Sequence, residues 1–302
     1  KDVIKNTEVE SFDYNFSNKG SLNIIDMLSD TEEPALGPNL YINFRILDEL
    51  KIKKIGTLYE GIGGDSAISH GHGHFYNLGR ELKLITLFDE YKKFCLNKKI
   101  KFSYIRCIKN FVVKPRIPEK ILRKMYNINK YRNDYFNVNN FLKNKYHIDV
   151  GRRYEEVHGY HPALASSFKY NPYFYEELST NDLFEPYASR VSYHIGKKFG
   201  VEIIFPFNDI RIREYCMNIP YNLKMHNGID RYYFRESMEK IIPKSIKNRV
   251  WKSDISPIFF NEMKELTLEQ FNDFIFKNNK YFEKFLDKDK VNQMFKKFKH
   301  AG

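Results

Sequence analysis

The sequence predicts an α/β protein, and three consecutive segments near the N-terminal side carry that prediction. In NLYINFRILDEL, residues 39–50, apolar residues recur near helical spacing and predict a helix with one buried face: Leu40, Phe44, Leu47 and Leu50. The following IKKIGTLYE is typical of a short strand that runs into glycines. A helix, a strand, a glycine turn and another helix-like segment form the alternation expected of an α/β sheet.

Further elements are expected on both sides of residue 150. ITLFDEYKKFCL is amphipathic, and ASRVSYHIGKKFG has Val191, Ile195 and Phe199 four apart, with Gly200 where a helix would end. VEIIFPFND then follows as a short strand or extended run. The second half of the chain is therefore predicted to be mainly helical.

Two more helices are predicted between residues 210 and 243. IRIREYCMNIP is expected to turn Ile210, Tyr215 and Ile219 inward and to stop at its proline. DRYYFRESMEKIIP is expected to continue as a helix up to Pro243, because proline cannot extend a helix.

Composition limits the class of protein. The chain has 302 residues, enough for a sizeable core, and no linker divides it, so a single domain over residues 1–302 is expected. No apolar run approaches the roughly 18 residues that span a bilayer, so no membrane partner is expected. The three cysteines form no C-x-x-C pair, which argues against a disulfide framework or a zinc site and favours a reducing, cytoplasmic location.

The net charge of +12 raises the alternative of nucleic-acid binding. Lysines are spread along the chain with acids between them, as in FLDKDKVNQMFKKFKH, so the sequence has no basic stripe. No nucleic-acid partner is therefore expected, whereas an anionic cofactor or an acidic peptide remains compatible with the charge.

The stretch YEGIGGDSAISHGHGH, residues 59–74, has several interpretations. The dinucleotide pattern G-x-G-x-x-G fails where Ser66 stands, and no G-K-[ST] follows. The remaining functional hypothesis is that unobstructed backbone amides bind phosphate oxygens, while Asp65 binds the Mg²⁺ of a nucleoside triphosphate. The alternative is a tight turn in which Asp65 caps the next helix.

The alternating histidines of the same stretch could face one side of an extended segment and bind zinc: His70, His72 and His74. Gly71 and Gly73 would leave that backbone loose, and no carboxylate is near in sequence. Histidines of a polar loop are the favoured interpretation.

Two distant regions together resemble a known family. GIGGDSAISHG and residues 200–259 are similar to the synthetase domain of the asparagine synthetase family, which includes β-lactam synthetases and the macrolactam cyclases of lasso peptides. Seven family motifs occur in order, and they correspond to Gly61 to Ser66, Gly200 to Asp209, Ile219-Pro220, Lys224 to Arg231, Arg235 to Met238, Ile242-Pro243 and Arg249 to Lys252.

The resemblance implies a fold and a reaction. The fold would be adenine α-hydrolase-like, of the ATP-pyrophosphatase type, with a parallel sheet flanked by helices and a helical C-terminal part. ATP and Mg²⁺ would convert a carboxylate to an acyl-adenylate with release of pyrophosphate. An amine would then attack to give an amide and AMP, so the partners would be a small-molecule or peptide carboxylate and an amine.

The resemblance also implies residue roles. Asp65 would bind Mg²⁺ on the pyrophosphate. The turn formed by Gly61, Gly63, Gly64 and Ser66 would bind the nucleotide, with the amides of Gly63 and Gly64 close to the substrate or the phosphates. Lys252 would stabilise the negative charge that develops in the tetrahedral adduct.

Further residues receive less specific roles. Arg235 and Arg249 would be phosphate-binding or structural partners, and Arg231 a weaker one. Asp209 keeps its interpretation as a structural helix cap. Glu185 is the nearest candidate for the acidic residue that helps to activate the amine in some members.

Several departures leave alternatives open. The family's Ser-Gly-Gly-x-Asp-Ser loop does not occur in this sequence, and Ser66 replaces the usual Glu. Because the chain begins with Lys1 rather than Met, that loop is expected in preceding residues or on another chain, with the domain N-terminally incomplete. No glutaminase domain occurs in this sequence; if the parent protein also lacks one, a specialised cyclase or ligase is favoured over asparagine synthetase itself. An inactive binding or scaffold subunit is the alternative from a different class.

Overall fold

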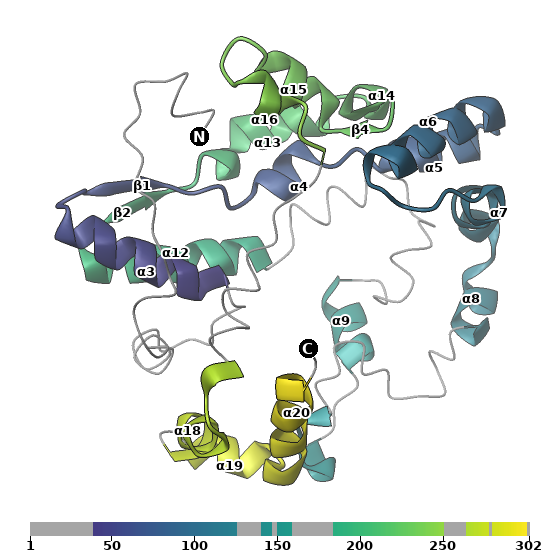
Figure 1. Ribbon diagram of the computed structural model, residues 1–302. Coiled ribbons are helices and arrows are strands. Elements are labelled where there is room, and N and C mark those ends of the chain that lie inside the picture. Colours follow the sequence, from purple (N-terminus) through teal and green to yellow (C-terminus); the bar gives the residue numbers. More distant parts are fainter. Residues whose placement is uncertain are drawn as a thin grey trace. The chain divides into compact units, whose positions relative to one another are not determined.

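The computed structural model describes residues 39–125, 140–146, 150–158, 184–250, 264–277 and 280–300. The described elements divide into two compact units (Figure 1). The first unit contains residues 43–117 and 184–250. The second contains residues 39–42, 118–125, 140–146, 150–158, 264–277 and 280–300.

Helices make up most of the first unit. Its N-terminal half consists of α3 (Asn39–Ile52), β1 (Thr57–Tyr59), α4 (Gly64–Ile68), α5 (Gly73–Arg80), α6 (Leu84–Asn97), α7 (Tyr104–Ile108), the π-helix η2 (Lys109–Val113) and the 3-10 helix η3 (Lys114–Arg116). Its C-terminal half consists of α12 (Phe184–Phe199), β2 (Glu202–Ile204), the 3-10 helix η6 (Pro206–Asn208), α13 (Ile210–Met217), α14 (Tyr221–Lys224), β3 (Met225–His226), β4 (Ile229–Asp230), α15 (Tyr232–Ser237) and α16 (Lys244–Lys247).

A small parallel sheet joins the two halves of this unit. β1 pairs with β2 so that Thr57 lies opposite Glu202 and Tyr59 opposite Ile204 (Figure 1). The backbone N–H of Glu60 continues the pairing with a 2.9 Å hydrogen bond to the Ile204 carbonyl. The described residues confirm the parallel sheet and the mainly helical second half that the sequence predicts.

Two long helices pack beside the sheet. In α3, Leu47 is fully buried, and the ring of Phe44 meets that of Phe199 of α12 edge-on at 5.6 Å. Val191 and Ile195 of α12 are both 3% exposed, so the predicted apolar face is buried. The helix ends before Gly200, whose φ of 72° lies in the left-handed region that glycine adopts readily.

An aromatic cluster forms the core around α5, α6, α7 and η2. Phe75 is 2% exposed, and its ring lies 5.5 Å from that of Tyr91 and 5.3 Å from that of Phe111. Gly79 allows α5 to approach η2 closely, because a Cβ there would lie 2.1 Å from the Phe111 carbonyl oxygen. Cross-packed aromatic rings of this kind bury large apolar areas.

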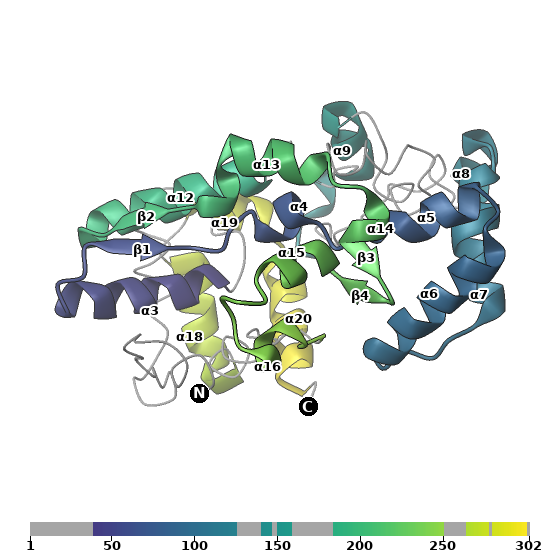
Figure 2. The same cartoon turned by 90° about the horizontal axis from the view of Figure 1, so that it is seen from above.

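The predicted inward face of α13 is wrong at two of three positions. Ile210 is 64% and Tyr215 71% exposed, whereas Ile219 is 8% exposed as expected. The helix lies beside α4 (Figure 2), and Cys216 is buried in place of Tyr215. Because α13 ends at Met217, Ile219 turns inward from the loop that follows rather than from the helix. The apolar pattern of the sequence therefore predicted the wrong side of α13 as its buried face.

The helix expected to run to Pro243 is also shorter than predicted. α15 ends at Ser237, and isolated turns follow, in which the N–H of Glu239 bonds to the Glu236 carbonyl and that of Ile241 to the Met238 carbonyl. The chain turns back here, so that residues 247–249 reach the side chain of Arg235.

The second unit is helical in its described part. It contains α8 (Glu119–Met125), the 3-10 helix η5 (Asn144–Tyr146), α9 (Val150–His158), α18 (Leu268–Asn272), the π-helix η7 (Asp273–Lys277), α19 (Lys280–Phe285) and α20 (Lys288–His300). Thr267 and Gln270 form a reciprocal capping box at α18. The rings of Phe271 and Phe295 stack at 4.0 Å and join α18 to α20.

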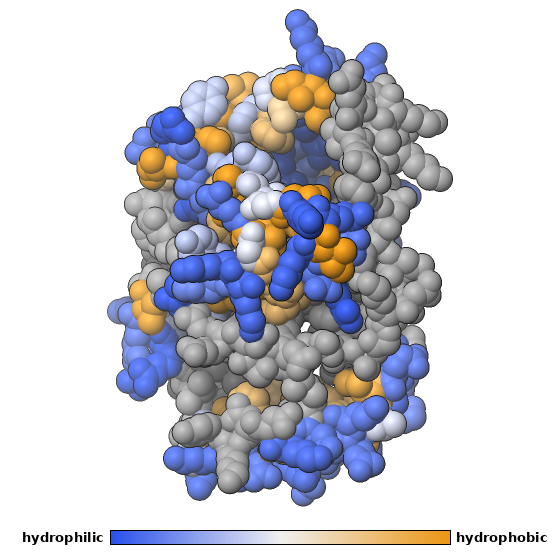
Figure 3. Space-filling model, turned by 90° about the vertical axis from the view of Figure 1, so that its left-hand side faces the viewer, coloured by the Kyte–Doolittle hydropathy of each residue, from blue (hydrophilic) through white to orange (hydrophobic). Residues whose placement is uncertain are grey.

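Figure 3 shows hydrophilic and hydrophobic residues interspersed on the face that it draws. Among the helices described, none is long and apolar enough to cross a membrane. All three cysteines are buried free thiols: Cys95, Cys107 and Cys216.

Candidate active site

The glycine turn lies between β1 and α4, at the carboxyl end of the strand. Gly63 has a φ of 88°, and a Cβ on it would lie 2.2 Å from Oδ1 of Asn208. Gly64 packs against the ring of Phe207, and a Cβ on it would lie 3.3 Å from the nearest ring carbon. The glycine pair is therefore needed for the close approach of the PFND segment, although the two motifs are more than 140 residues apart in sequence.

Asn208 and Asp209 hold the PFND segment in place. The amide of Asn208 donates to the Ser189 hydroxyl at 2.8 Å and accepts from Arg213 at 2.8 Å. Asp209 caps α13 by accepting from the Arg211 N–H at 2.9 Å. Hydrogen bonds from the Arg211 side chain and backbone lower the pKa of Asp209 to about 2. Its predicted structural role is confirmed.

Asp65 lies in the first turn of α4 but does not cap the helix. The residue at the cap is Gly63, and no side-chain cap bond forms there. The Asp65 carboxylate is 60% exposed and pairs with the guanidinium of Arg231. The same Arg231 nitrogen lies 3.1 Å from Nε2 of His70, so a cation and an imidazole stand beside the exposed carboxylate.

A second carboxylate, that of Asp230, is buried and connects this group to the rest of the unit. Nδ1 of His70 lies 3.6 Å from it, Nζ of Lys98 2.8 Å and Nη2 of Arg235 3.2 Å. Burial opposes ionisation of Asp230, but the hydrogen bonds from His70 and Lys98 and the charges of Lys98 and Arg231 outweigh it, so its pKa lies well below the usual value. Asp230 is therefore a stable buried anion.

The cations around Asp230 also hold the chain that follows α16. Arg235 donates through Nη1 to the carbonyls of Lys247 at 2.6 Å and Arg249 at 2.8 Å. Lys98 donates to the Val250 carbonyl at 2.7 Å. Of the two roles that the sequence left open for Arg235, these contacts favour the structural one, and Arg249 enters the described network through its backbone.

The hairpin β3–β4 contains Gly228, the glycine of the family motif that runs from Lys224 to Arg231. Asn227 and Gly228 both have positive φ angles, of 49° and 67°, and their N–H groups donate to the buried carboxylate of Glu90 at 3.0 and 2.9 Å. A Cβ on Gly228 would lie 2.1 Å from the backbone nitrogen of Phe94. The hairpin is therefore docked on α6, and it positions the adjacent Asp230 and Arg231.

The glycines between the histidines have a packing role. A Cβ on Gly71, whose φ is 73°, would lie 2.6 Å from the Lys224 carbonyl carbon, and one on Gly73 would lie 2.4 Å from the ring of Tyr221. Among the described residues, no group of three His, Cys, Asp or Glu side chains could hold a metal ion. The zinc hypothesis therefore has no support there, but His70 contacts both Asp65 and Asp230 and is more than a loop residue.

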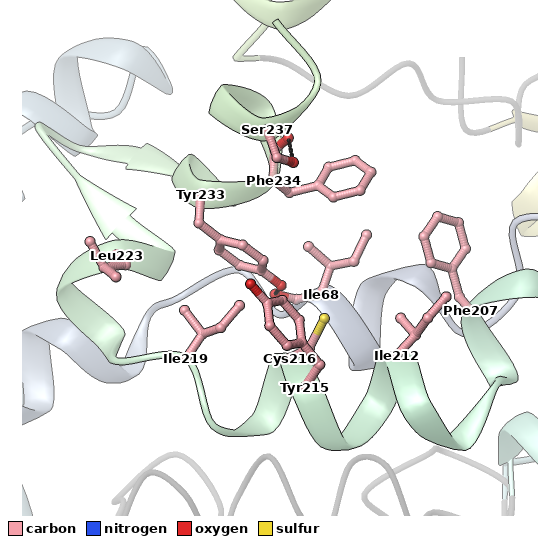
Figure 4. A pocket seen from close by; sticks show the side chains of 10 residues that line it. All are labelled: Ile68, Phe207, Ile212, Tyr215, Cys216, Ile219, Leu223, Tyr233, Phe234 and Ser237. Carbon is pink, nitrogen blue, oxygen red and sulfur yellow. Dashed lines mark hydrogen bonds between the residues drawn. The ribbon is translucent and has the colours of Figure 1, made fainter. Parts of the chain in front are cut away.

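A pocket of about 330 Å³ opens beside α4, between α13 and α15 (Figure 4). Its lining is mostly apolar, with the hydroxyls of Tyr215, Tyr233 and Ser237 as polar groups. Tyr233 donates to the Ile68 carbonyl at 2.9 Å and so ties α15 to α4. Because Ile68 follows Asp65 by three residues, the pocket lies about one helical turn along α4 from that carboxylate.

The side chains of two predicted site residues are not described by the structure. Lys252 lies outside the described residues, and Glu185 falls in the first turn of α12, where only the backbone is described. Ser66 donates its hydroxyl to the Gly63 carbonyl at 3.2 Å, whereas a Cβ on Gly61 would meet nothing within 4 Å. Sequence reasoning missed Lys98 and Asp230, which lie in no pattern that marks their contact.

The described turn, the exposed Asp65 and the cations behind it form a strand–turn–helix arrangement in which separate family motifs meet. The family model described as asparagine synthase matches residues 1–302, so the chain belongs to the asparagine synthase family. No curated protein and no solved structure matches it. The family uses ATP, and membership supports an ATP-dependent ligase that forms amide bonds.

Proposed function

We propose that this protein activates a carboxylate with ATP, releases pyrophosphate, and transfers the acyl group to an amine with release of AMP. A carboxylate oxygen would attack the α-phosphorus while the bond to pyrophosphate breaks, and the amine would then displace AMP from the acyl carbon. The fold would be adenine α-hydrolase-like and the protein cytoplasmic. The observation that carries the proposal is the convergence of separate family motifs around Asp65 and Asp230.

The donor set around Asp65 fits Mg²⁺ that is bound together with a nucleotide. Mg²⁺ prefers one or two carboxylates completed by phosphate oxygens and waters, rather than a cage of protein ligands. Asp65 provides one exposed carboxylate, in the first turn of α4 directly after the glycine turn. When bound, the ion would neutralise the phosphate charge, and Arg231 would exchange Asp65 for an anionic group of the nucleotide.

Lys252 would supply the positive charge needed when the tetrahedral adduct forms, since a preorganised cation is most effective where charge develops. Glu185 would accept the proton of the attacking amine. The amine and the carboxylate could belong to one peptide, as in the lasso cyclases that the sequence resembles.

The apolar pocket of Figure 4 favours a substrate with an apolar or aromatic group over aspartate. Asparagine synthetase activity is therefore the second candidate. Rates of pyrophosphate exchange distinguish these two candidate activities. The protein is supplied with Mg²⁺, ATP and either aspartate or a peptide that carries apolar groups next to the reacting carboxylate.

The central experiment measures ATP–pyrophosphate exchange and Mg·ATP binding with the full-length protein. We expect exchange in the parent protein, a loss of about 100-fold in the rate of amide formation, followed as AMP release with the amine present, in Lys252→Ala, and parental behaviour in the control Lys244→Ala, which alters an exposed lysine of α16. Absence of both exchange and Mg·ATP binding in the parent would contradict the proposal and favour the scaffold alternative, which the uncharged Ser66 also suggests.

A further inference from the structure

Lys98 lies just beyond the last residue of α6 and is bonded to two groups that are distant in sequence. Its Nζ donates to the buried Asp230 carboxylate at 2.8 Å and to the Val250 carbonyl at 2.7 Å. A lysine ammonium has three donors, so these two bonds leave its geometry well defined. The contact fixes Val250 relative to β4 and α6 through 152 residues of sequence separation.

Arg235 strengthens the same attachment from the other side of Asp230. Its Nε donates to the Asp230 carbonyl at 2.8 Å, and its Nη1 donates to two carbonyls of the segment 247–249. Together, Lys98 and Arg235 bind the carbonyls of residues 247, 249 and 250, which places the whole end of this segment against one buried anion.

The segment that is held in this way leads directly to Lys252. Val250 precedes Lys252 by two residues, and two residues span at most about 7 Å. A displacement of about 1 Å at a reacting group is enough to reduce a rate strongly, and an attachment at Val250 acts close enough to control such a displacement.

We propose that Lys98 is a positioning residue: by bridging Asp230 and the Val250 carbonyl, it fixes the chain immediately before Lys252, an inference that rests on the proposed function of Lys252. Lys98 itself does not contact the reacting atoms. Its removal should therefore affect the chemical step more than the binding of ATP.

The test compares Lys98→Met with the parent protein and with Lys92→Met, which removes the same charge from an exposed position of α6. For Lys98→Met we expect kcat for amide formation, followed as AMP release, to fall about tenfold or more, with the KM for ATP within about twofold of the parental value. Lys98→Arg should recover most of the rate, because a guanidinium can donate to both acceptors. Lys92→Met should behave as the parent does.

Amide hydrogen exchange over residues 244–250 provides a readout that does not depend on activity. We expect it to be about tenfold faster in Lys98→Met than in the parent protein. Unchanged hydrogen exchange, or an unchanged kcat, in Lys98→Met would overturn the inference. A parent protein without activity would instead contradict the proposed function, and the hydrogen-exchange result would still decide whether Lys98 holds the segment.

Discussion

At the scale of single residues, Asp230 is the most connected charge in the described site. Three cationic or imidazole side chains surround its buried carboxylate, and two of them also hold backbone carbonyls: His70, Lys98 and Arg235. Removing one member of such a buried group leaves the charges of the others uncompensated. The resulting loss of stability is usually larger than the net contribution of the whole group. Asp230 should therefore be a stability residue as well as a part of the site.

Asp230→Asn should lower the free energy of unfolding by about 3 kcal/mol at pH 7. Because the folded-state pKa of Asp230 is lowered, its contribution is present above the unfolded pKa of about 3.9 and is lost as the pH falls through the folded value. Urea unfolding should show a constant difference between parent and variant from pH 7 to about 5, narrowing below about 4. A difference that does not narrow would contradict this account of Asp230.

The glycines of the turn provide a second prediction at this scale. Gly63→Ala should cost about 1 to 3 kcal/mol of stability, because its φ is 88° and the new methyl group would overlap Asn208. Gly61→Ala is the matched control, since nothing lies within 4 Å of its Cβ position. The free energies of unfolding of both variants, measured with a chemical denaturant, test this prediction. Equal losses of stability at the two glycines would argue against close packing of residues 206–209 on the turn.

At the scale of elements, the β3–β4 hairpin depends on α6 for its position. Glu90 accepts both N–H groups of the hairpin turn, and Gly228 contacts the α6 backbone directly. A two-stranded hairpin has little stability alone. Its docking therefore determines where Asp230 and Arg231, which follow the turn, can stand.

Glu90→Ala should destabilise the protein by about 1 to 3 kcal/mol, because two buried N–H groups would lose their acceptor. Asp89→Ala is the control on the same helix, since its pair with Lys93 is exposed to solvent and contributes little to stability. Unfolding curves measure both effects. The rate of amide hydrogen exchange at Asn227 and Gly228 should rise in Glu90→Ala but not in Asp89→Ala. An unchanged exchange rate in Glu90→Ala would show that another group holds the hairpin.

At the scale of the whole molecule, a ligand that binds only the folded protein raises its stability by mass action. Mg·ATP at about 100 times its Kd should add about 2.7 kcal/mol, which a thermal scan of the full chain would record as a higher Tm. Asp65→Asn should remove most of the Mg²⁺-dependent part of that shift, because the amide is a poorer ligand than the carboxylate. The control Asp89→Asn should keep the full shift, and a full shift in Asp65→Asn would exclude Asp65 from the metal site.

The two compact units also limit what stability measurements on the whole chain report. Each unit has its own packed interior, with Phe75 and its neighbouring rings in the first and the Phe271–Phe295 stack in the second. Unfolding should therefore be followed by probes in each unit before a single free energy is assigned. The single domain expected from the sequence stays a prediction.

The sequence by itself determined the parts that depend on local order. The buried faces of α3 and α12 follow from helical periodicity, the strand before the glycines follows from its apolar residues, and the ordered motifs identify the family. Periodicity was insufficient for α13, because the phase of a short helix is set by its neighbours. It was also insufficient for α15, which ends at Ser237 although its helix-like pattern continues to Pro243.

Only the tertiary structure decided which charged groups meet. Asp65 meets Arg231 across 166 residues and Lys98 meets Asp230 across 132, and contacts of such separation leave no spacing in the sequence that marks them. The same holds for the alternating glycines and histidines of residues 70–74. Gly71 and Gly73 allow this segment to pack closely against α14. His70 lies between the carboxylates of Asp65 and Asp230, which are far apart in the sequence.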